Sequence, residues 1–315
     1  MLASVTRSSF KLTRPLFNVQ SCRQLSSGQT NIDHIKRVGV IGSGQMGLGI
    51  AYVAANVTQL PVVLMDISKD QTDRGLAFMN KLLEKDVAKN KITADHANKV
   101  RELVSTTNSL QTLDQMDIVI EAASENLNIK SKIFSDLDQI CKSDCILASN
   151  TSSISITKIG AATKRAENVI GMHFMNPVPV MKLVELIPGL ATSPEIVDQT
   201  KALATAMGKT TTVVKDIPGF VANRLLMPYI NEAVMLLESE FASAEDIDTT
   251  MKLGTNMPMG PLTLADFIGL DTCLSIMKVL HENTGDSKYR PSVLLQKYVD
   301  AGWVGKKAGR GIYTY

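Results

Sequence analysis

A glycine-rich turn between a predicted strand and a predicted helix constrains this chain more than any other feature. Residues 42–47 read Gly-Ser-Gly-Gln-Met-Gly, after the apolar segment 37–42 and at the start of a helix predicted over residues 44–57. In this pattern the first glycine allows a tight turn, the second lets backbone approach a pyrophosphate, and the third allows close helix–strand packing. The N–H groups at the start of the helix then face the phosphates. The residues predicted to bind a dinucleotide are Gly42, Ser43, Gly44, Gln45, Met46 and Gly47.

The next predicted strand, residues 60–66, ends in Asp66. An acid at this place accepts hydrogen bonds from the ribose hydroxyls and disfavours a 2′-phosphate. The sequence therefore predicts NAD rather than NADP as the cofactor. A structural glycine turn followed by a surface aspartate is the alternative, but the strand, turn, helix and acid occur here in the required order.

Strand-like and helical segments alternate as far as residue 215, which predicts a mainly parallel sheet. Further strands are predicted over residues 117–121, 144–149, 169–174, 180–187 and 211–214, and helices over 70–89, 94–101, 127–140 and 194–207. Beyond Pro218-Gly219 the pattern is helical, over residues 220–238, 243–253, 261–268, 271–281 and 291–301. We therefore predict an α/β Rossmann-type N-terminal domain over residues 31–215 and an all-α C-terminal domain over residues 216–315.

The first 30 residues differ in composition from the rest. They contain basic residues among serines and spaced hydrophobes, and no acidic residue occurs before Asp33. This composition predicts a mitochondrial transit peptide over residues 1–30, and hence a protein of the mitochondrial matrix. A disordered tail without a targeting role is the alternative.

Composition argues against several classes of function. The net charge of +2 carries no broad basic excess for nucleic acid, and no apolar run reaches the roughly 18 residues of a membrane span. The four cysteines and four histidines form no zinc-binding spacing, so we expect reduced thiols and no metal. An alcohol oxidised by such a protein must therefore lose its proton to a side chain.

One histidine and one glutamate are candidates for that role. His173 closes the apolar segment 169–174, and Glu185 is the only polar residue on its face of the predicted strand 180–187. A carboxylate among apolar neighbours costs several kcal/mol unless it has a partner. A histidine–carboxylate pair commonly orients an imidazole as a base, although a purely structural buried pair is the alternative.

Polar residues also follow the strands at 149–153 and 121–126, where ligands of open α/β sheets gather. Taken alone, Ser149-Asn-Thr-Ser-Ser153 is better explained by a polar turn with helix-capping residues.

Four segments together carry a specific resemblance. They are Ser149-Asn-Thr-Ser-Ser153, the segment from His173 to Glu185, Pro218-Gly-Phe-Val-Ala-Asn-Arg-Leu225, and Gly305-Lys-Lys-Ala-Gly-Arg-Gly-Ile-Tyr313. In this order they resemble the mitochondrial L-3-hydroxyacyl-CoA dehydrogenases, and the likeness runs from about residue 38 to residue 315. The resemblance implies NAD-dependent oxidation of (S)-3-hydroxyacyl-CoA to 3-oxoacyl-CoA, a step of fatty-acid β-oxidation.

The resemblance also implies roles for single residues. His173 would be the general base that takes the proton of the 3-hydroxyl group as hydride leaves C3, and Glu185 would orient the imidazole. Ser152 and Asn223 would hydrogen-bond the reacting oxygen or nearby substrate atoms. Asn223 has local support, because asparagine is a poor choice at an apolar helix start unless its amide has a partner.

The remaining implied contacts concern the cofactor and the CoA moiety. Asn176 matches a contact near the nicotinamide, Glu125 and Lys130 match ribose and cofactor contacts, and Lys307 a further NAD contact. The family's serine and lysine for acyl-CoA lie on the helix after the second strand, but that region is shortened here and has no clear serine. Lys81, Lys85 and Lys89 lie on one face of the predicted helix, where they either meet the CoA phosphates, with Lys89 as the candidate, or form a solvated basic face.

The resemblance further implies a homodimer formed through the C-terminal domain. Two alternatives remain open at this point. The β-hydroxyacid dehydrogenases share the glycine pattern and a helical second domain, but use a lysine in place of the histidine and act on free acids. A non-catalytic NAD-binding protein of the same fold is the other. Preference for acyl-chain length is not indicated, since it depends on pocket shape.

Overall fold

A computed structural model describes residues 32 and 34–315. The predicted transit peptide, residues 1–30, lies outside these described residues. The sheet contains eight strands: β1 (Val38–Ile41), β2 (Val62–Met65), β3 (Val104–Thr107), β4 (Ile118–Glu121), β5 (Ile146–Ser149), β6 (Val169–Phe174), β7 (Leu183–Pro188) and β8 (Thr210–Val213). Their order is β3-β2-β1-β4-β5-β6-β7-β8, and β6 and β7 are the only antiparallel neighbours in it. The predicted, mainly parallel sheet is confirmed.

The order of the strands reverses between β1 and β4, because the chain builds β1 to β3 outwards in one direction and then returns to the other side of β1. Ligands of open α/β sheets bind beyond the carboxyl ends of the strands at such a reversal. This edge of the sheet is therefore where a site is expected.

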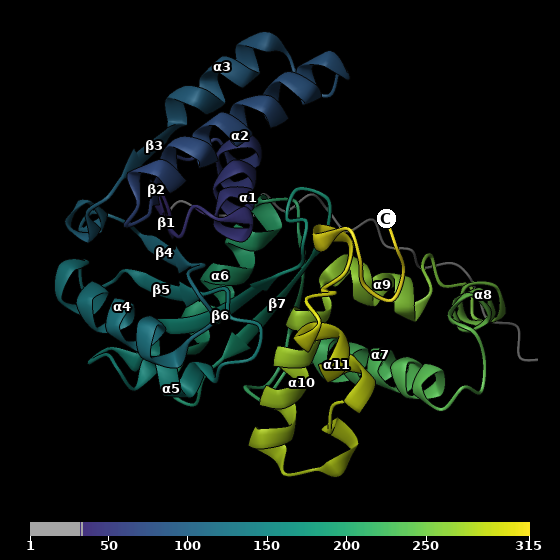
Figure 1. Ribbon diagram of the computed structural model, residues 1–315. Coiled ribbons are helices and arrows are strands. Elements are labelled where there is room, and N and C mark those ends of the chain that lie inside the picture. Colours follow the sequence, from purple (N-terminus) through teal and green to yellow (C-terminus); the bar gives the residue numbers. More distant parts are fainter. Residues whose placement is uncertain (1–31, 33) are drawn as a thin grey trace, which may run out of the picture. The chain divides into compact units, whose positions relative to one another are not determined.

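Helices cover both faces of the sheet (Figure 1). They are α1 (Gln45–Val53), α2 (Lys69–Ala88), α3 (Ala94–Leu103), α4 (Leu127–Ile140), α5 (Ile156–Gly160) and α6 (Pro194–Ala206). Alternate strand residues serve the two faces, so Ile118 and Ile120 pack with the layer of α1, α2, α3 and α6, whereas Val119 packs with the layer of α4 and α5. Burial on both faces explains why these strands are continuously apolar.

After β8 the chain is helical, as the green and yellow ribbons of Figure 1 show. The helices are α7 (Ala222–Glu238), α8 (Ala244–Gly254), α9 (Pro261–Ile268), α10 (Leu270–Thr284) and α11 (Val293–Asp300). They enclose an apolar core of their own, which includes Ile230, Leu262 and Leu274. The predicted fold class, a Rossmann-type α/β domain followed by an all-α domain, is confirmed.

Some predicted elements were wrong in extent. The strand predicted over 180–187 begins at Leu183, because the N–H groups of Val180 and Met181 turn back to donate to Pro177 O. Met181 is therefore not on the strand face of Glu185. The helix predicted over 44–57 is α-helical only to Val53 and continues as a π-helical turn, Ala54–Thr58.

Two elements were missed. The strand β3 is a short edge strand of sequence Val-Ser-Thr-Thr, which pairs only with β2 and has no apolar alternation that would reveal it. The five-residue helix α5 is too short to show a helical period.

Candidate active site

The glycine turn combines two glycines that the fold requires with one that it does not. A Cβ atom on Gly42, whose φ is +96°, would lie 2.5 Å from Ala122 O, and one on Gly47 would lie 1.8 Å from Gly42 O. A Cβ atom on Gly44 would meet nothing within 4 Å. Because packing leaves this side of Gly44 open, close approach of a ligand is what explains a glycine there. The turn therefore fits a dinucleotide.

Alanine substitutions should separate these two roles. Gly47→Ala is expected to lower the free energy of unfolding by about 2 kcal/mol or more, because its Cβ atom would collide with backbone. Gly44→Ala is expected to change the free energy of unfolding by less than about 1 kcal/mol. It should weaken NADH binding by about tenfold or more, because the added methyl group obstructs the pyrophosphate. Urea unfolding and NADH fluorescence titration measure the two effects. Unchanged NADH affinity in Gly44→Ala would contradict this role.

Asp66 lies directly after β2 and is already ordered by neighbouring groups. Its Oδ2 atom accepts hydrogen bonds from Ser43 N at 2.9 Å and Ser43 Oγ at 3.0 Å, and its Oδ1 atom accepts one from Ser68 N at 3.0 Å. Burial by itself would raise the pKa of Asp66, but these hydrogen bonds outweigh it and hold the pKa below its ordinary value. Asp66 is therefore an ionised acceptor beside the glycine turn.

A cavity of about 790 Å³ opens at this place. Its lining includes Gly42, Gly44 and Asp66 together with apolar side chains of Ile67, Leu110, Ile129 and Ile133. An acid and glycines together with apolar side chains suit a sugar attached to a flat aromatic base. The cavity thus has the chemistry of an adenosine site.

His173 and Glu185 form a buried pair. The antiparallel register of β6 and β7 places these two residues directly opposite each other, so their side chains share one face. His173 Nδ1 lies 2.8 Å from Glu185 Oε2, and the residues are 5% and 1% exposed. No hydrogen bond joins His173 Nε2 to any of the described residues, so this nitrogen is available to a substrate. The pairing that the sequence suggested is confirmed.

The second oxygen of Glu185 binds the start of the helical domain. Glu185 Oε1 accepts hydrogen bonds from Val221 N at 3.1 Å and Ala222 N at 3.0 Å, at the N-terminus of α7. Burial would raise the pKa of Glu185, but the hydrogen bonds from His173 and from these two N–H groups outweigh it and hold the pKa below its ordinary value. The carboxylate therefore stays ionised between the imidazole and α7.

The loop that follows β5 is held by Glu125. Its Oε1 atom accepts hydrogen bonds from Thr151 Oγ1 at 2.6 Å, Ser152 N at 2.9 Å and Ser153 N at 3.1 Å. Asn223 of α7 reaches the same loop, since its Nδ2 atom donates to Ser152 O at 3.3 Å. The structure thus brings Ser152, Asn223 and Glu125 together and gives the amide of Asn223 the partner that its sequence context requires.

Asn176 links the histidine strand to the glycine turn. Gln45 Nε2 donates to Asn176 Oδ1 at 3.0 Å, although the two residues are 131 positions apart. Asn150, at the end of β5, accepts a hydrogen bond from Phe174 N at 2.8 Å. These bonds tie the ends of β1, β5 and β6 into one polar cluster.

Lys130, for which a cofactor contact is predicted, lies in a buried ion pair. It is 1% exposed, and its Nζ atom donates to Glu121 Oε1 at 2.7 Å and Oε2 at 2.9 Å. Glu125 Oε2 lies 3.5 Å from the same Nζ atom. Lys130 is therefore buried between Glu121 and Glu125, and its contact with the cofactor stays a prediction. The sequence indicated Glu121 only as the first residue of the polar segment 121–126 at the end of an apolar strand, without a role of its own.

Two other predicted residues are not joined to this cluster by any contact within the described residues. Lys307 Nζ lies 2.7 Å from both oxygens of Asp271, at the start of α10. Lys89 is exposed and directly follows α2, a 20-residue helix that begins at the Asp66 end. At 1.5 Å per residue, Lys89 is about 30 Å from that end. Contacts of Lys89 and Lys307 with ligands stay predictions.

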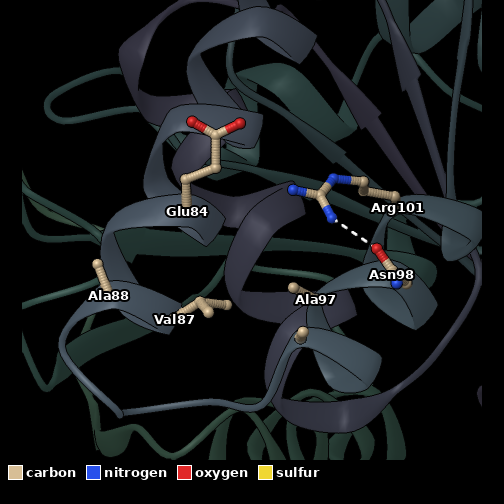
Figure 2. Close-up of a pocket in the computed structure, with 7 residues that line it drawn as sticks. Glu84, Val87, Ala88, Ala97, Asn98 and Arg101 are labelled. Carbon is tan, nitrogen blue, oxygen red and sulfur yellow. Dashed lines mark hydrogen bonds between the residues drawn. The ribbon is translucent and has the colours of Figure 1, made fainter.

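Figure 2 shows a second, smaller hollow of about 270 Å³ between α2 and α3. It is lined by Glu84, Val87, Ala88, Ala94, Ala97, Asn98 and Arg101. Lys81, Lys85 and Lys89 do not line it. Its cation, Arg101, already donates to Asn98 Oδ1 at 2.8 Å and Asn80 Oδ1 at 3.0 Å. The hollow therefore adds nothing to the expected CoA contacts.

Over residues 32 and 34–315, no group of three or more His, Cys, Asp or Glu residues is placed to hold a metal ion. Within the same part of the chain, no helix has the length and apolar character needed to cross a membrane.

Known proteins resemble this chain over both domains. Residues 37–217 match the family model of the 3-hydroxyacyl-CoA dehydrogenase NAD binding domain, and residues 219–315 match that of the 3-hydroxyacyl-CoA dehydrogenase C-terminal domain. A probable 3-hydroxybutyryl-CoA dehydrogenase of Bacillus subtilis is 54% identical over 281 residues, which cover 89% of this chain and 98% of that protein. The mitochondrial hydroxyacyl-coenzyme A dehydrogenase of Homo sapiens is 40% identical over 311 residues, 96% of this chain and 99% of that protein.

A solved structure agrees with these similarities. The crystal structure of (S)-3-hydroxybutyryl-CoA dehydrogenase from Ralstonia eutropha is similar to this fold with a TM-score of 0.86 and 49% sequence identity. The match covers 89% of this chain and 99% of that one.

Proposed function

This chain belongs to the 3-hydroxyacyl-CoA dehydrogenase family, and from that premise we propose that it oxidises (S)-3-hydroxyacyl-CoA to 3-oxoacyl-CoA with His173 as the general base. Membership of the family makes the protein an NAD-dependent oxidoreductase. The observation that carries the proposal is the buried His173–Glu185 pair, with 2.8 Å between Nδ1 and Oε2, in a polar cluster that extends to the glycine turn.

NAD, when bound, supplies the acceptor for the hydride that leaves C3. His173 Nε2 takes the proton of the 3-hydroxyl group, and Glu185 stabilises the imidazolium that results. The Nδ1–H group donates to Glu185 Oε2, which keeps the unprotonated nitrogen directed at the substrate. Ser152 and Asn223 hydrogen-bond the reacting oxygen or nearby substrate atoms, and Glu125 and Asn176 position the cofactor. Lys307 adds a cofactor contact and Lys89 a contact with the CoA phosphates.

Short acyl chains are the proposed substrates, because the similar proteins from Bacillus subtilis and Ralstonia eutropha are named for 3-hydroxybutyryl-CoA. The decisive experiment is NADH consumption with acetoacetyl-CoA, followed by a series of longer 3-oxoacyl-CoA substrates. We expect the highest kcat/KM at four carbons. A wild-type protein that binds NADH but turns over no acyl-CoA would contradict the proposal and favour the non-catalytic alternative.

The β-hydroxyacid dehydrogenases make a second comparison. They would turn over free 3-hydroxyisobutyrate and would place a lysine at the base. Here the position is His173, paired with Glu185, so turnover of 3-hydroxybutyryl-CoA and none of the free acid is expected.

Replacing Asp66 should test the preference for NAD. Asp66→Asn is expected to lower kcat/KM for NAD by about tenfold, because the carboxylate contact with a ribose hydroxyl is lost, and to change kcat/KM for NADP far less. Steady-state kinetics with both cofactors gives the ratio. An unchanged ratio would show that Asp66 does not select the cofactor.

We further propose that the protein acts in the mitochondrial matrix, in fatty-acid β-oxidation. The acid-free, basic and serine-containing composition of residues 1–30 supports this location, as does the similarity to a human mitochondrial enzyme over 311 residues. Residues 1–30 fused to a fluorescent protein should direct it to mitochondria. Diffuse fluorescence would contradict the proposal.

A homodimer formed by the helical domain is the last part of this proposal. Large apolar side chains are exposed there, including Leu225, Phe241 and Leu253 at 70%, 80% and 75%. A contiguous exposed apolar surface often marks an association site, and we propose that these side chains meet the second chain. Sedimentation velocity should give twice the mass of one chain, and Phe241→Glu with Leu253→Glu should give the mass of one.

A further inference from the structure

A buried ion pair supports the loop that carries Ser152. Glu121 is fully buried and Lys130 is 1% exposed, and two hydrogen bonds of 2.7 and 2.9 Å join them. Glu121 Oε1 also accepts a hydrogen bond from Ala123 N at 2.7 Å, and Oε2 one from Ser149 Oγ at 2.7 Å. Each carboxylate oxygen therefore has two donors, so this side chain has no capacity left to bind a ligand directly.

Stability alone does not explain such a pair. Removing two charges from water costs several kcal/mol each, and their attraction commonly no more than offsets that cost. A buried ion pair that is fully hydrogen-bonded does, however, fix the relative positions of the groups around it. The groups around Glu121 are therefore the place to look for its role.

Those groups belong to the active site. Glu121 ends β4 at the reversal of strand order, where it is in register with Ile41 of β1 and Ser149 of β5. Its carbonyl oxygen accepts a hydrogen bond from Asn150 N at 2.7 Å. Through Ser149 and Asn150 it sets where the loop leaves the sheet, and Ser152 follows three residues after Ser149.

Glu121 also acts on the loop indirectly, through Lys130 and Glu125. Lys130 Nζ lies 3.5 Å from Glu125 Oε2, while Oε1 of the same carboxylate holds Thr151, Ser152 and Ser153. The Glu121 carboxylate therefore binds Ser149 at the start of the loop, the Glu125 carboxylate binds the loop itself, and both lie next to Lys130.

We propose that Glu121 is a positioning residue for the dehydrogenase reaction: with Lys130 it orients Glu125 and the Ser152 loop toward the cofactor and the reacting oxygen. The expected effect of Glu121 on kcat rests on the proposed function. The expected effect of Glu121 on NADH binding rests on the geometry alone. Lys130 then acts through Glu125 rather than by touching the cofactor.

The test compares Glu121→Gln with the double variant Glu121→Gln/Lys130→Gln. Glu121→Gln leaves a buried ammonium that competes for Glu125, and should lower the melting temperature by roughly 10 °C. The double variant removes both charges and allows an amide–amide hydrogen bond, so its melting temperature should return to within about 4 °C of wild type. If Glu121 positions the loop, kcat in the double variant should still be about 10- to 100-fold low, with NADH affinity reduced and KM for acetoacetyl-CoA nearly unchanged.

Asp138→Asn is the matched control. It breaks an ion pair between the same helix, α4, and Arg165, with 2.8 Å between Asp138 Oδ1 and Arg165 Nε. It should lower the melting temperature and leave kcat and NADH affinity unchanged. Wild-type kcat and NADH affinity in the stable double variant would overturn the proposal.

Two further outcomes of this experiment also decide the role of Glu121. If the double variant does not fold, Ser149→Ala removes one hydrogen bond to Glu121 and keeps the ion pair; it should lower kcat severalfold, and an unchanged kcat would overturn the proposal. If the wild type has no acyl-CoA turnover, the proposed function fails, and NADH affinity across the same variants still decides the role of Glu121.

Discussion

His173→Ala should lower kcat for acetoacetyl-CoA-dependent NADH oxidation by about 10²- to 10⁴-fold, the usual contribution of a general base or acid. The imidazole lies opposite Glu185 and is joined to it by a 2.8 Å contact, so no other histidine can replace it in that geometry. NADH affinity should change by less than about threefold, because the predicted pyrophosphate and adenosine contacts of the cofactor follow β1 and β2 rather than β6. Steady-state kinetics and fluorescence titration on the same sample separate these effects.

His34→Ala serves as the control, since His34 is exposed and makes no part of the proposed site. It should retain wild-type kcat. Retention of more than a tenth of wild-type kcat in His173→Ala, with the fold intact, would remove His173 from its proposed role.

Glu185 should give a second large effect, on activity and on stability. Glu185→Ala leaves the imidazole without its partner and the N–H groups of Val221 and Ala222 without an acceptor. It should reduce kcat by about 10³-fold and the free energy of unfolding by about 3 kcal/mol. Kinetics and urea unfolding measure the two losses.

Glu185→Gln separates the two roles of this carboxylate. The glutamine carbonyl oxygen can still accept from Val221 and Ala222, so most of the stability should remain. Its NH₂ group would face Nδ1 and favour the tautomer with a proton on Nε2, which cannot act as a base. We therefore expect a kcat loss close to that of Glu185→Ala. A fully active Glu185→Gln would show that the carboxylate serves only to bind α7.

The pH dependence of stability follows from the lowered pKa of Glu185. Burial acts to raise that pKa, but the hydrogen bonds to the carboxylate lower it by more, so the pKa in the folded protein is below its ordinary value. The ionised form is therefore favoured by folding, and its contribution is complete above the unfolded pKa of about 4.3 and is lost as the pH falls through the folded value below it. The difference in unfolding free energy between wild type and Glu185→Gln should therefore shrink as the pH falls below about 5.

The outline of the fold could be predicted because its signals are local. The glycine spacing of residues 42–47, the period of α4 and the apolar run of β6 each depend on neighbouring residues alone, and β6 and α4 were predicted with the observed bounds. The strand β3 was not predicted, because this edge strand is defined by its hydrogen bonds to β2 and not by its own sequence. The start of β7 was predicted too early, because the residues that form the turn after Pro177 have a pattern that also suits a strand.

The sequence by itself determined the fold class, the glycine turn and the pairing of His173 with Glu185, since short-range patterns and the cost of an unpaired carboxylate are sufficient for these. Only the tertiary structure decided what else each acid binds. Glu185 also binds the N-terminus of α7, and the Glu121–Lys130 pair lies next to Glu125. Both arrangements depend on strand register and on burial between elements that are distant in the chain. Side-chain contacts of this kind arise only when the sheet brings the ends of β4, β5 and β7 together, and no local pattern records them.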